Sequence, residues 1–215
     1  MYVIIADSKM PEQAKLSLEK LGKVIWFESE NLVYNAISGH PDIFLTQIEN
    51  YLVVAPNTPK NILKELDNCN ISFCLGEKSL GIKYPKTAFY NALVTNNYII
   101  HNINITDNVL KEKTIDKRPI HVKQGYGRCN CVSLNEKVFV TSDIGIYKTL
   151  VDNKLESVYI NPNEIILNDF DHGFFGGTCG IFNENIVFCC SLSNIVGGEE
   201  LRGIINKVGF NIVEL

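Results

Sequence analysis

The residues best suited to chemistry in this chain stand in short polar segments between apolar runs. Cys179 follows two glycines in the segment GGTCG, where the small backbone lets a ligand approach closely. A cysteine becomes a nucleophile when a cation, a helix N-terminus or a histidine stabilises its thiolate. Cysteine is also among the most buried residue types and packs as a small hydrophobic side chain. Both interpretations of Cys179 stay open on the residues alone.

His40 and Asp42 form a second candidate pair. They stand two residues apart at the opening of the predicted strand DIFLTQ (42–47), so both side chains are expected on one side of a sheet. In a reaction on an amidine, a histidine can protonate the leaving amine while a carboxylate holds the guanidinium. The segment GHPD also has the composition of an ordinary turn. We favour the functional interpretation because the pair opens a central strand.

Two further groups compete with these candidates. Asp171 and His172, in the segment DHGFFGG, offer a rival acid–base pair close in sequence to Cys179. Cys129 and Cys131 lie on the predicted strand CNCVSL (129–134), with His121 upstream. A structural zinc site needs a second ligand pair, and side-chain packing explains the C-x-C spacing as well. We therefore predict no metal and no cofactor.

These residues must be positioned by a repeated pattern of elements. Four hairpins recur along the chain, with turn residues Asn50, Asn97, Lys137 and Asn185 spaced 40 to 48 residues apart. A constant period in this range indicates a repeat architecture. Each hairpin precedes a helical pattern and a closing strand, and a first strand–helix–strand unit precedes them all. Cys189 and Cys190 are expected as core residues of the strand IVFCCSL (186–192).

The pattern predicts an α/β protein of five ββαβ repeats that form a single domain over residues 1–215. Units of this size cannot bury a core alone, so we expect them to pack around an axis as an α/β-propeller with a pseudo-fivefold arrangement. The segments between units then meet at one end of the central channel. This placement brings His40, Asn91, Cys129 and Cys179 together, and it makes Asn91, Arg128, Cys129 and Asp171 candidate substrate-binding residues.

Composition limits the class of protein. The 215 residues are 46 % hydrophobic and 20 % charged, with a net charge of −4, which indicates a real core and argues against a nucleic-acid partner. No apolar run has the length of a membrane span, and the first residues lack the features of a signal peptide. Seven cysteines without framework spacing are typical of reduced thiols, so we expect a cytoplasmic protein.

The chain resembles the pentein fold, the five-bladed α/β-propeller of glycine-amidinotransferase-like proteins, and in particular a bacterial family of uncharacterised function on that fold. The residues that carry the likeness are GHPDIFLTQI (39–48), KQGYGRCNCVSL (123–134), VFVTSDIGI (138–146) and DHGFFGGTCGIF (171–182). The resemblance covers essentially the whole chain.

The resemblance implies two hypotheses about function. Enzymes of this fold modify guanidino compounds with a cysteine of the last blade, a histidine and acidic residues, which implies Cys179 as nucleophile, His40 or His172 as proton shuttle and Asp42 as substrate ligand. Its partner is then a small guanidino or amide compound. The fold also includes a non-catalytic ribosome anti-association factor, so the alternative is a binding module for a small ligand or a macromolecule.

Overall fold

The computed structural model describes residues 2–215 and contains five separate β-sheets with helices between their strands. The first sheet has two parallel strands, β1 (Val3–Asp7) and β2 (Lys23–Phe27), joined by α1 (Glu12–Glu19). The sequence predicts this strand–helix–strand unit without a hairpin, and that prediction is confirmed.

The other four sheets share one topology. In each of them an antiparallel hairpin is followed by a helix and by a third strand, which pairs in parallel with the second strand of the hairpin. In chain order their elements are β3 (Leu45–Ile48), β4 (Tyr51–Val54), α3 (Lys60–Asn68) and β5 (Ser72–Leu75); β6 (Leu93–Val94), β7 (Tyr98–His101), α4 (Asn108–Lys113) and β8 (Arg118–His121); β9 (Cys131–Leu134), β10 (Val138–Thr141), α6 (Ile144–Asp152) and β11 (Glu156–Tyr159); β12 (Cys179–Phe182), β13 (Asn185–Phe188), α7 (Gly198–Val208) and β14 (Asn211–Glu214).

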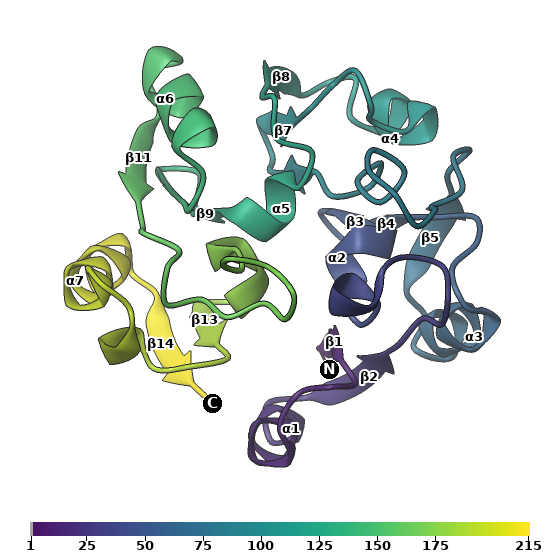
Figure 1. Cartoon of the computed structure of the whole chain (residues 1–215), viewed down its shortest axis with the longest axis horizontal. Coiled ribbons are helices and arrows are strands. Elements are labelled where there is room, and N and C mark those ends of the chain that lie inside the picture. The colour runs from purple at the N-terminus through teal and green to yellow at the C-terminus, as the bar shows by residue number, and fades with distance from the viewer. Residues whose placement is uncertain (1) are drawn as a thin grey trace.

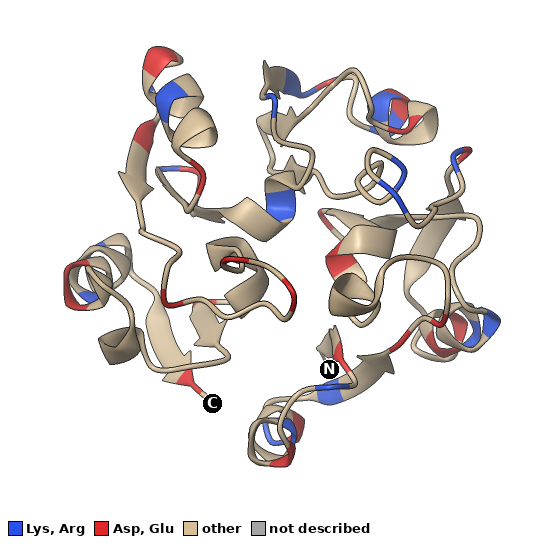
Figure 2. Cartoon of the chain, viewed as in Figure 1, with Lys and Arg blue, Asp and Glu red and all other residues tan. Residues whose placement is uncertain are grey.

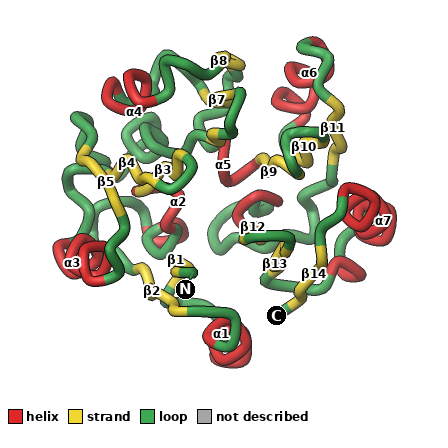
Figure 3. The backbone as a smooth tube through the Cα atoms, turned by 180° about the vertical axis from the view of Figure 1, so that it is seen from behind, coloured by secondary structure: helices red, strands yellow, loops and turns green. Residues whose placement is uncertain are grey.

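The sheets follow one another around the centre of the molecule in chain order (Figure 1). Helices α1, α3, α4, α6 and α7 lie on the outside, and the view from behind shows the same arrangement (Figure 3). The first and last sheets are neighbours, and the rings of Tyr2 and Phe182 lie 5.7 Å apart between their centroids. Strand pairing stops at the edge of each sheet, so side chains rather than a continuous hydrogen-bonded ladder connect the units.

Apolar side chains pack across the boundaries between neighbouring units. The rings of Phe27 and Phe44 lie 5.0 Å apart and join the first and second units. Ile100 and Phe139 share a buried cluster between the third and fourth units. Because every sheet contributes to a core shared with its neighbour, burial of apolar surface holds the units in place.

Short helical turns precede the first strand of three sheets. These turns are α2 (Pro41–Phe44), α5 (Gly127–Asn130) and η2 (Phe175–Thr178). Pro41 suits a first helical position because its φ angle is preset and its missing N–H has no intrahelical partner there. The predicted strands are therefore wrong over residues 42–44 and 129–130. Neither the His40–Asp42 pair nor the Cys129–Cys131 pair shares the face of a strand.

Two further details differ from the sequence-based expectations. Cys189 and Cys190 lie beyond the end of β13. Cys189 is exposed and Cys190 is partly exposed, so neither is a core residue of a strand. The remaining helical turns, η1 (Asn35–Ile37) and η3 (Leu192–Asn194), were not predicted. Both are single 3₁₀ turns, which are too short to leave a periodic pattern in the sequence.

Charged residues lie mostly on the outer helices and on surface loops (Figure 2). The elements toward the middle of the molecule carry few of them, as the same view shows. Among residues 2–215, no helix combines the length and the apolar character that crossing a bilayer requires.

His101 connects β7 to the loop that leads to α5. The imidazole is completely buried, its Nε2 lies 2.8 Å from the carbonyl oxygen of Gly125, and its Nδ1 lies 2.7 Å from Oγ1 of Thr106. Burial disfavours the charged ring and lowers the pKa of His101 from 6.5 to about 4. The folded protein therefore holds this histidine neutral.

We predict that His101 makes the fold less stable in mild acid. Above pH 6.5 the ring is neutral in both states; between pH 6.5 and 4 only the unfolded chain takes up the proton, because its pKa is the higher one. The free energy of unfolding should fall by about 3 kcal/mol across that interval from this residue alone. Urea unfolding at several pH values measures this fall in the free energy of unfolding. In His101→Gln, whose amide can still donate to Gly125, the slope should be shallower, and an unchanged slope would contradict the prediction.

Candidate functional site

The helical turn α2 carries two of the candidate residues. Its Ile43 and Phe44 are fully buried and anchor the turn in the core. His40, at the N-cap position, and Asp42, in the first turn, remain partly exposed. Because the apolar half of this turn is held inside, the polar half is presented toward the neighbouring units.

The helical turn α5 brings Cys129 to the same place from a distant part of the chain. Cys129 is only 3 % exposed, and its thiol donates a hydrogen bond to Oδ2 of Asp42 over 3.1 Å. One ring nitrogen of His40, one carboxylate oxygen of Asp42 and Sγ of Cys129 all lie within 4.8 Å of one another. Three chemically active groups from two units therefore converge in one cluster, which we call the His40–Asp42–Cys129 cluster.

Asn91 holds the two halves of this cluster together from the third unit. Its side chain is completely buried. The amide Nδ2 donates to the carbonyl oxygen of Asp42 over 2.9 Å and to Sγ of Cys129 over 3.1 Å, while Oδ1 accepts from the backbone N–H of Cys129 over 3.0 Å. Both ends of the amide are thus engaged by protein groups. The predicted role of Asn91 as a direct substrate ligand stays a prediction.

Burial and charge keep the thiol of Cys129 protonated. Desolvation raises its pKa well above the ordinary value, and the neighbouring Asp42 carboxylate raises it further. The hydrogen bond from Asn91 and the charge of Arg128 act in the opposite direction but are the smaller effects. The thiol therefore keeps its proton and donates it to Oδ2 of Asp42.

A second carboxylate lies behind His40. Nε2 of His40 is 3.9 Å from Oδ2 of Asp7, the last residue of β1. Gly39 makes this approach possible, because a Cβ atom at that position would lie only 2.0 Å from Oδ1 of Asp7. The first unit therefore also contributes to the surroundings of the cluster. Asp7 is not among the residues predicted from the sequence, because it precedes His40 by a whole unit and belongs to no local motif with it.

A small pocket opens beside the cluster. It has a cavity volume of about 120 Å³, and His40 and Cys129 form part of its wall together with the aromatic residues Tyr34, Tyr126 and Phe174. Sites for drug-sized ligands occupy roughly 300–1,000 Å³. This pocket is therefore large enough for a small head group or a small molecule only.

The phenols at the pocket are tied to each other. The hydroxyl oxygens of Tyr34 and Tyr126 lie 3.3 Å apart, and that of Tyr126 is 2.6 Å from Oγ1 of Thr87. Burial raises the pKa of both phenols, so both stay neutral at physiological pH. Neutral aromatic faces suit a planar cation. Asp42 does not line the pocket itself and contacts the lining residue Cys129.

Cys179 lies at the start of β12, as predicted, but outside the cluster. The residues lining the pocket include its neighbours Gly177 and Thr178 and not Cys179 itself. Its sulfur faces the carbonyl oxygens of Phe175 and Gly176 at 3.9 Å. Burial raises the pKa of Cys179 to about 12, and the charge of Arg128 only partly opposes this effect.

The other predicted site residues have separate positions. Arg128 donates to the carbonyl oxygens of Gly176 and Cys179 over 2.6 and 3.0 Å, and so fastens η2 to α5. Nδ1 of His172 donates to the carbonyl oxygen of Gly173 over 2.8 Å, and Asp171 is exposed. Of the predicted residues, the structure brings His40, Asp42, Asn91 and Cys129 together. It does not bring Cys179, Asp171 or His172 into that cluster.

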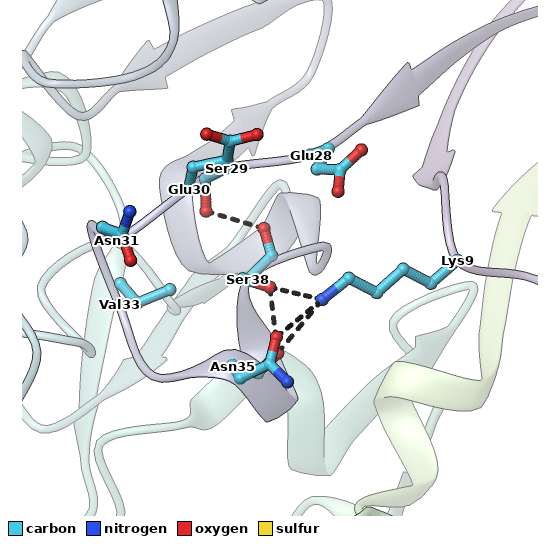
Figure 4. A pocket seen from close by; sticks show the side chains of 8 residues that line it. All are labelled: Lys9, Glu28, Ser29, Glu30, Asn31, Val33, Asn35 and Ser38. Atoms are coloured by element: carbon cyan, nitrogen blue, oxygen red, sulfur yellow. Dashed lines mark hydrogen bonds between the residues drawn. The ribbon is translucent and has the colours of Figure 1, made fainter.

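A larger and more polar hollow lies between the first unit and η1 (Figure 4). It has a cavity volume of about 280 Å³ and contains Lys9, Glu28, Asn35 and Ser38. Nζ of Lys9 donates to Oδ1 of Asn35 over 3.0 Å and to Oγ of Ser38 over 2.7 Å. The ammonium group of Lys9, the only cationic side chain drawn in Figure 4, is thus already bound by protein oxygens. His40, Asp42 and Cys129 do not line this hollow.

Comparison with known proteins shows the family and the fold. Residues 5–215 match the Family of unknown function (DUF6873), and the chain belongs to this family. No curated protein matches the sequence.

Solved structures resemble it over nearly the whole chain at low sequence identity. DDAH from Pseudomonas aeruginosa, solved as a mutant with citrulline, has a TM-score of 0.58 at 9 % identity, covering 99 % of this chain and 91 % of that one. An amidinotransferase from Microseira wollei, of the saxitoxin pathway, has a TM-score of 0.58 at 10 % identity, covering 100 % of this chain and 88 % of the amidinotransferase. The agmatine deiminase of C. jejuni has a TM-score of 0.53 at 9 % identity, covering 99 % of this chain and 74 % of the deiminase. The resemblance to the pentein fold is confirmed.

We predict that Asn91 is essential for the stability of the cluster. Asn91→Ala leaves the N–H of Cys129 and the carbonyl of Asp42 without their buried partner, which should cost about 2–3 kcal/mol. Urea unfolding measures the loss. Asn104→Ala is the matched control, because Asn104 is exposed, and it should change the stability by less than about 0.5 kcal/mol. Equal effects of the two substitutions would contradict the role given to Asn91.

We also predict the order in which the thiols react. Cys179 should be alkylated by iodoacetamide at pH 7.5 at least about tenfold more slowly than the exposed Cys189, because Cys179 is buried and its pKa is raised to about 12, against about 11 for Cys189. Peptide mapping by mass spectrometry after timed quenching measures both rates in one sample. Preferential labelling of Cys179 would show instead that its thiolate is stabilised and accessible.

Proposed function

We propose that the chain is a single domain over residues 1–215 whose five units are the blades of a pseudo-fivefold propeller. The shared topology of four sheets and the packing between successive units support this proposal. The central position of the helical turns α2 and α5, on the inner side of their sheets, agrees with it (Figure 1).

We further propose that the protein modifies a small guanidino or amide compound, as a hydrolase or as an amidinotransferase. The observation that carries this proposal is the convergence of His40, Asp42 and Cys129 beside a pocket with aromatic walls. The carboxylate of Asp42 provides the anion that a guanidinium requires, and the rings of Tyr34 and Tyr126 provide faces for a planar cation. The known proteins of similar fold include an amidinotransferase and an agmatine deiminase.

In the proposed reaction Cys129, rather than Cys179, is the nucleophile. Its Sγ bonds to the central carbon of the substrate, and its proton passes to Asp42, the acceptor it already faces. His40 gives a proton to the departing nitrogen as the carbon–nitrogen bond breaks. Water, or a second amine in a transferase, then attacks the same carbon and gives one proton to His40; in hydrolysis the other proton of the water is released to solvent as the carbonyl product forms. The sulfur leaves and recovers its proton from Asp42, so that all groups return to their initial state.

A second candidate function is binding without catalysis. The protonated state of Cys129 favours it, because a thiol is a far weaker nucleophile than a thiolate. A cationic ligand beside Asp42 would then be held by charge and by the aromatic rings alone. The small cavity volume limits such a ligand to a compact head group.

A turnover screen with paired cysteine variants tests the proposal. Arginine, agmatine and methylated arginines are incubated with the protein, and release of ammonia, urea or citrulline is measured. Turnover should fall by at least about 10³-fold in Cys129→Ala and stay within a few-fold in Cys179→Ala. Loss in Cys179→Ala alone would move the nucleophile back to Cys179. Thermal stabilisation by one of these compounds without any turnover would support the binding module instead.

A further inference from the structure

We propose that His40, Asp42 and Cys129 form a binding site for a divalent transition metal, with Zn²⁺ as the ion that suits it best. An imidazole nitrogen, a carboxylate oxygen and a thiolate sulfur are the three kinds of protein ligand that Zn²⁺ takes. A hard cation such as Mg²⁺ is disfavoured, because it prefers oxygen ligands alone.

The distances between the donor atoms fit such an ion. Zn²⁺ lies about 2.0–2.3 Å from its ligands, so neighbouring donors in a tetrahedron are roughly 3.5 Å apart. Sγ of Cys129 and Oδ2 of Asp42 are 3.1 Å apart, and all three donors lie within 4.8 Å of one another. Side-chain rotation of His40 and Asp42, which are both partly exposed, can supply the remaining adjustment of about 1 Å or less per atom.

The groups around the donors have the arrangement that metal ligands require. The amide of Asn91 donates to the sulfur and also holds the backbone on both sides, which keeps α2 and α5 at a constant separation. The carboxylate of Asp7 lies 3.9 Å from Nε2 of His40 and can orient the ring through its N–H. Outer partners of this kind commonly orient the ligands and raise their affinity for the metal.

The charges also balance. Asp42 and Cys129 are two acidic groups in contact. A divalent cation has the charge of one carboxylate and one thiolate together, and it leaves the imidazole uncharged. Two such donors side by side, with a neutral third ligand, therefore match a doubly charged ion.

Three protein ligands leave one position of a tetrahedron open. His40 and Cys129 both line the pocket, so this position faces the cavity and can take a water molecule or a small anion. The C-x-C spacing of Cys129 and Cys131 predicts no metal, because no second ligand pair stands nearby in the sequence. The missing ligands instead come from α2, almost ninety residues earlier in the chain.

The inference goes beyond the proposed function and does not depend on it. A metal bound to all three side chains occupies Asp42 and His40, which the proposed reaction needs to accept and to donate protons, so the metal-bound form cannot carry out that reaction. Zinc binding can therefore be tested on a protein that turns over no substrate. A protein with turnover and no zinc binding would refute this inference alone.

The experiment is a titration of the full chain, freed of metal by a chelator, with Co²⁺ and with Zn²⁺. Co²⁺ should give one equivalent of a tetrahedral visible spectrum with a sulfur-to-cobalt charge-transfer band, and Zn²⁺ should displace it. Competition with a chromophoric chelator measures the Zn²⁺ affinity. Prior saturation with Zn²⁺ should slow the alkylation of Cys129 at least tenfold.

Matched variants locate the site. Cys129→Ser, Asp42→Asn and His40→Gln should each weaken Zn²⁺ binding by at least about 100-fold, and Asp7→Asn by about tenfold. Cys179→Ser, which changes a buried thiol outside the cluster, should leave the affinity within about twofold. Near-UV circular dichroism checks that each variant is folded. Asp42→Asn is the decisive variant, because the amide oxygen can still accept from Cys129 and preserve the fold.

Three results would overturn the inference. One is a wild-type protein that shows no charge-transfer band at one equivalent of Co²⁺. Another is Zn²⁺ binding that survives in a folded Asp42→Asn variant with unchanged affinity. The third is loss of binding in Cys179→Ser with retention in Cys129→Ser, which would assign the metal to a different thiol.

Discussion

The side-chain amide of Asn91 is the interaction on which the site depends. This residue belongs to the third unit, yet its hydrogen bonds go to Asp42 in the second unit and to Cys129 in the fourth. Helical turns of four residues have little stability of their own. The amide gives both turns a buried partner, and the core residues Ile43 and Phe44 prevent α2 from turning away. Asn91 therefore determines how closely Asp42 and Cys129 approach each other, and it needs no contact with a ligand to do so.

The same burial that builds the cluster also determines which chemistry it favours. An isolated buried thiol beside a carboxylate keeps its proton, and only an added positive charge changes that balance. A guanidinium and a metal ion both supply such a charge, one from an organic ligand and the other from an inorganic one. Cys179 differs because its sulfur faces two carbonyl oxygens, with no carboxylate among its partners in residues 2–215, and because it does not line the pocket. A cysteine at the expected point of the last unit is thus not sufficient to define a reactive centre.

Much of the fold could be predicted from the sequence, because each element leaves a local pattern. Short apolar runs separated by polar turns at a regular spacing predicted four hairpins, and each is an antiparallel strand pair in the structure. The errors occurred where the chain changes conformation within a few residues. Asp42 and Cys129 were expected on strands, but each lies in a single helical turn that directly precedes a strand. A four-residue turn is shorter than one period of the pattern that would reveal it.

The sequence by itself determined the period of the units, the composition of the core and the small set of residues in which a site had to be found. Only the tertiary structure decided which of them meet. Cys129 faces Asp42, Asp7 stands behind His40, and Arg128 is engaged by two carbonyl oxygens. The physical reason is that contacts between units depend on the angle and depth at which neighbouring sheets pack. That geometry results from many buried side chains acting together, and no short segment of the chain encodes it.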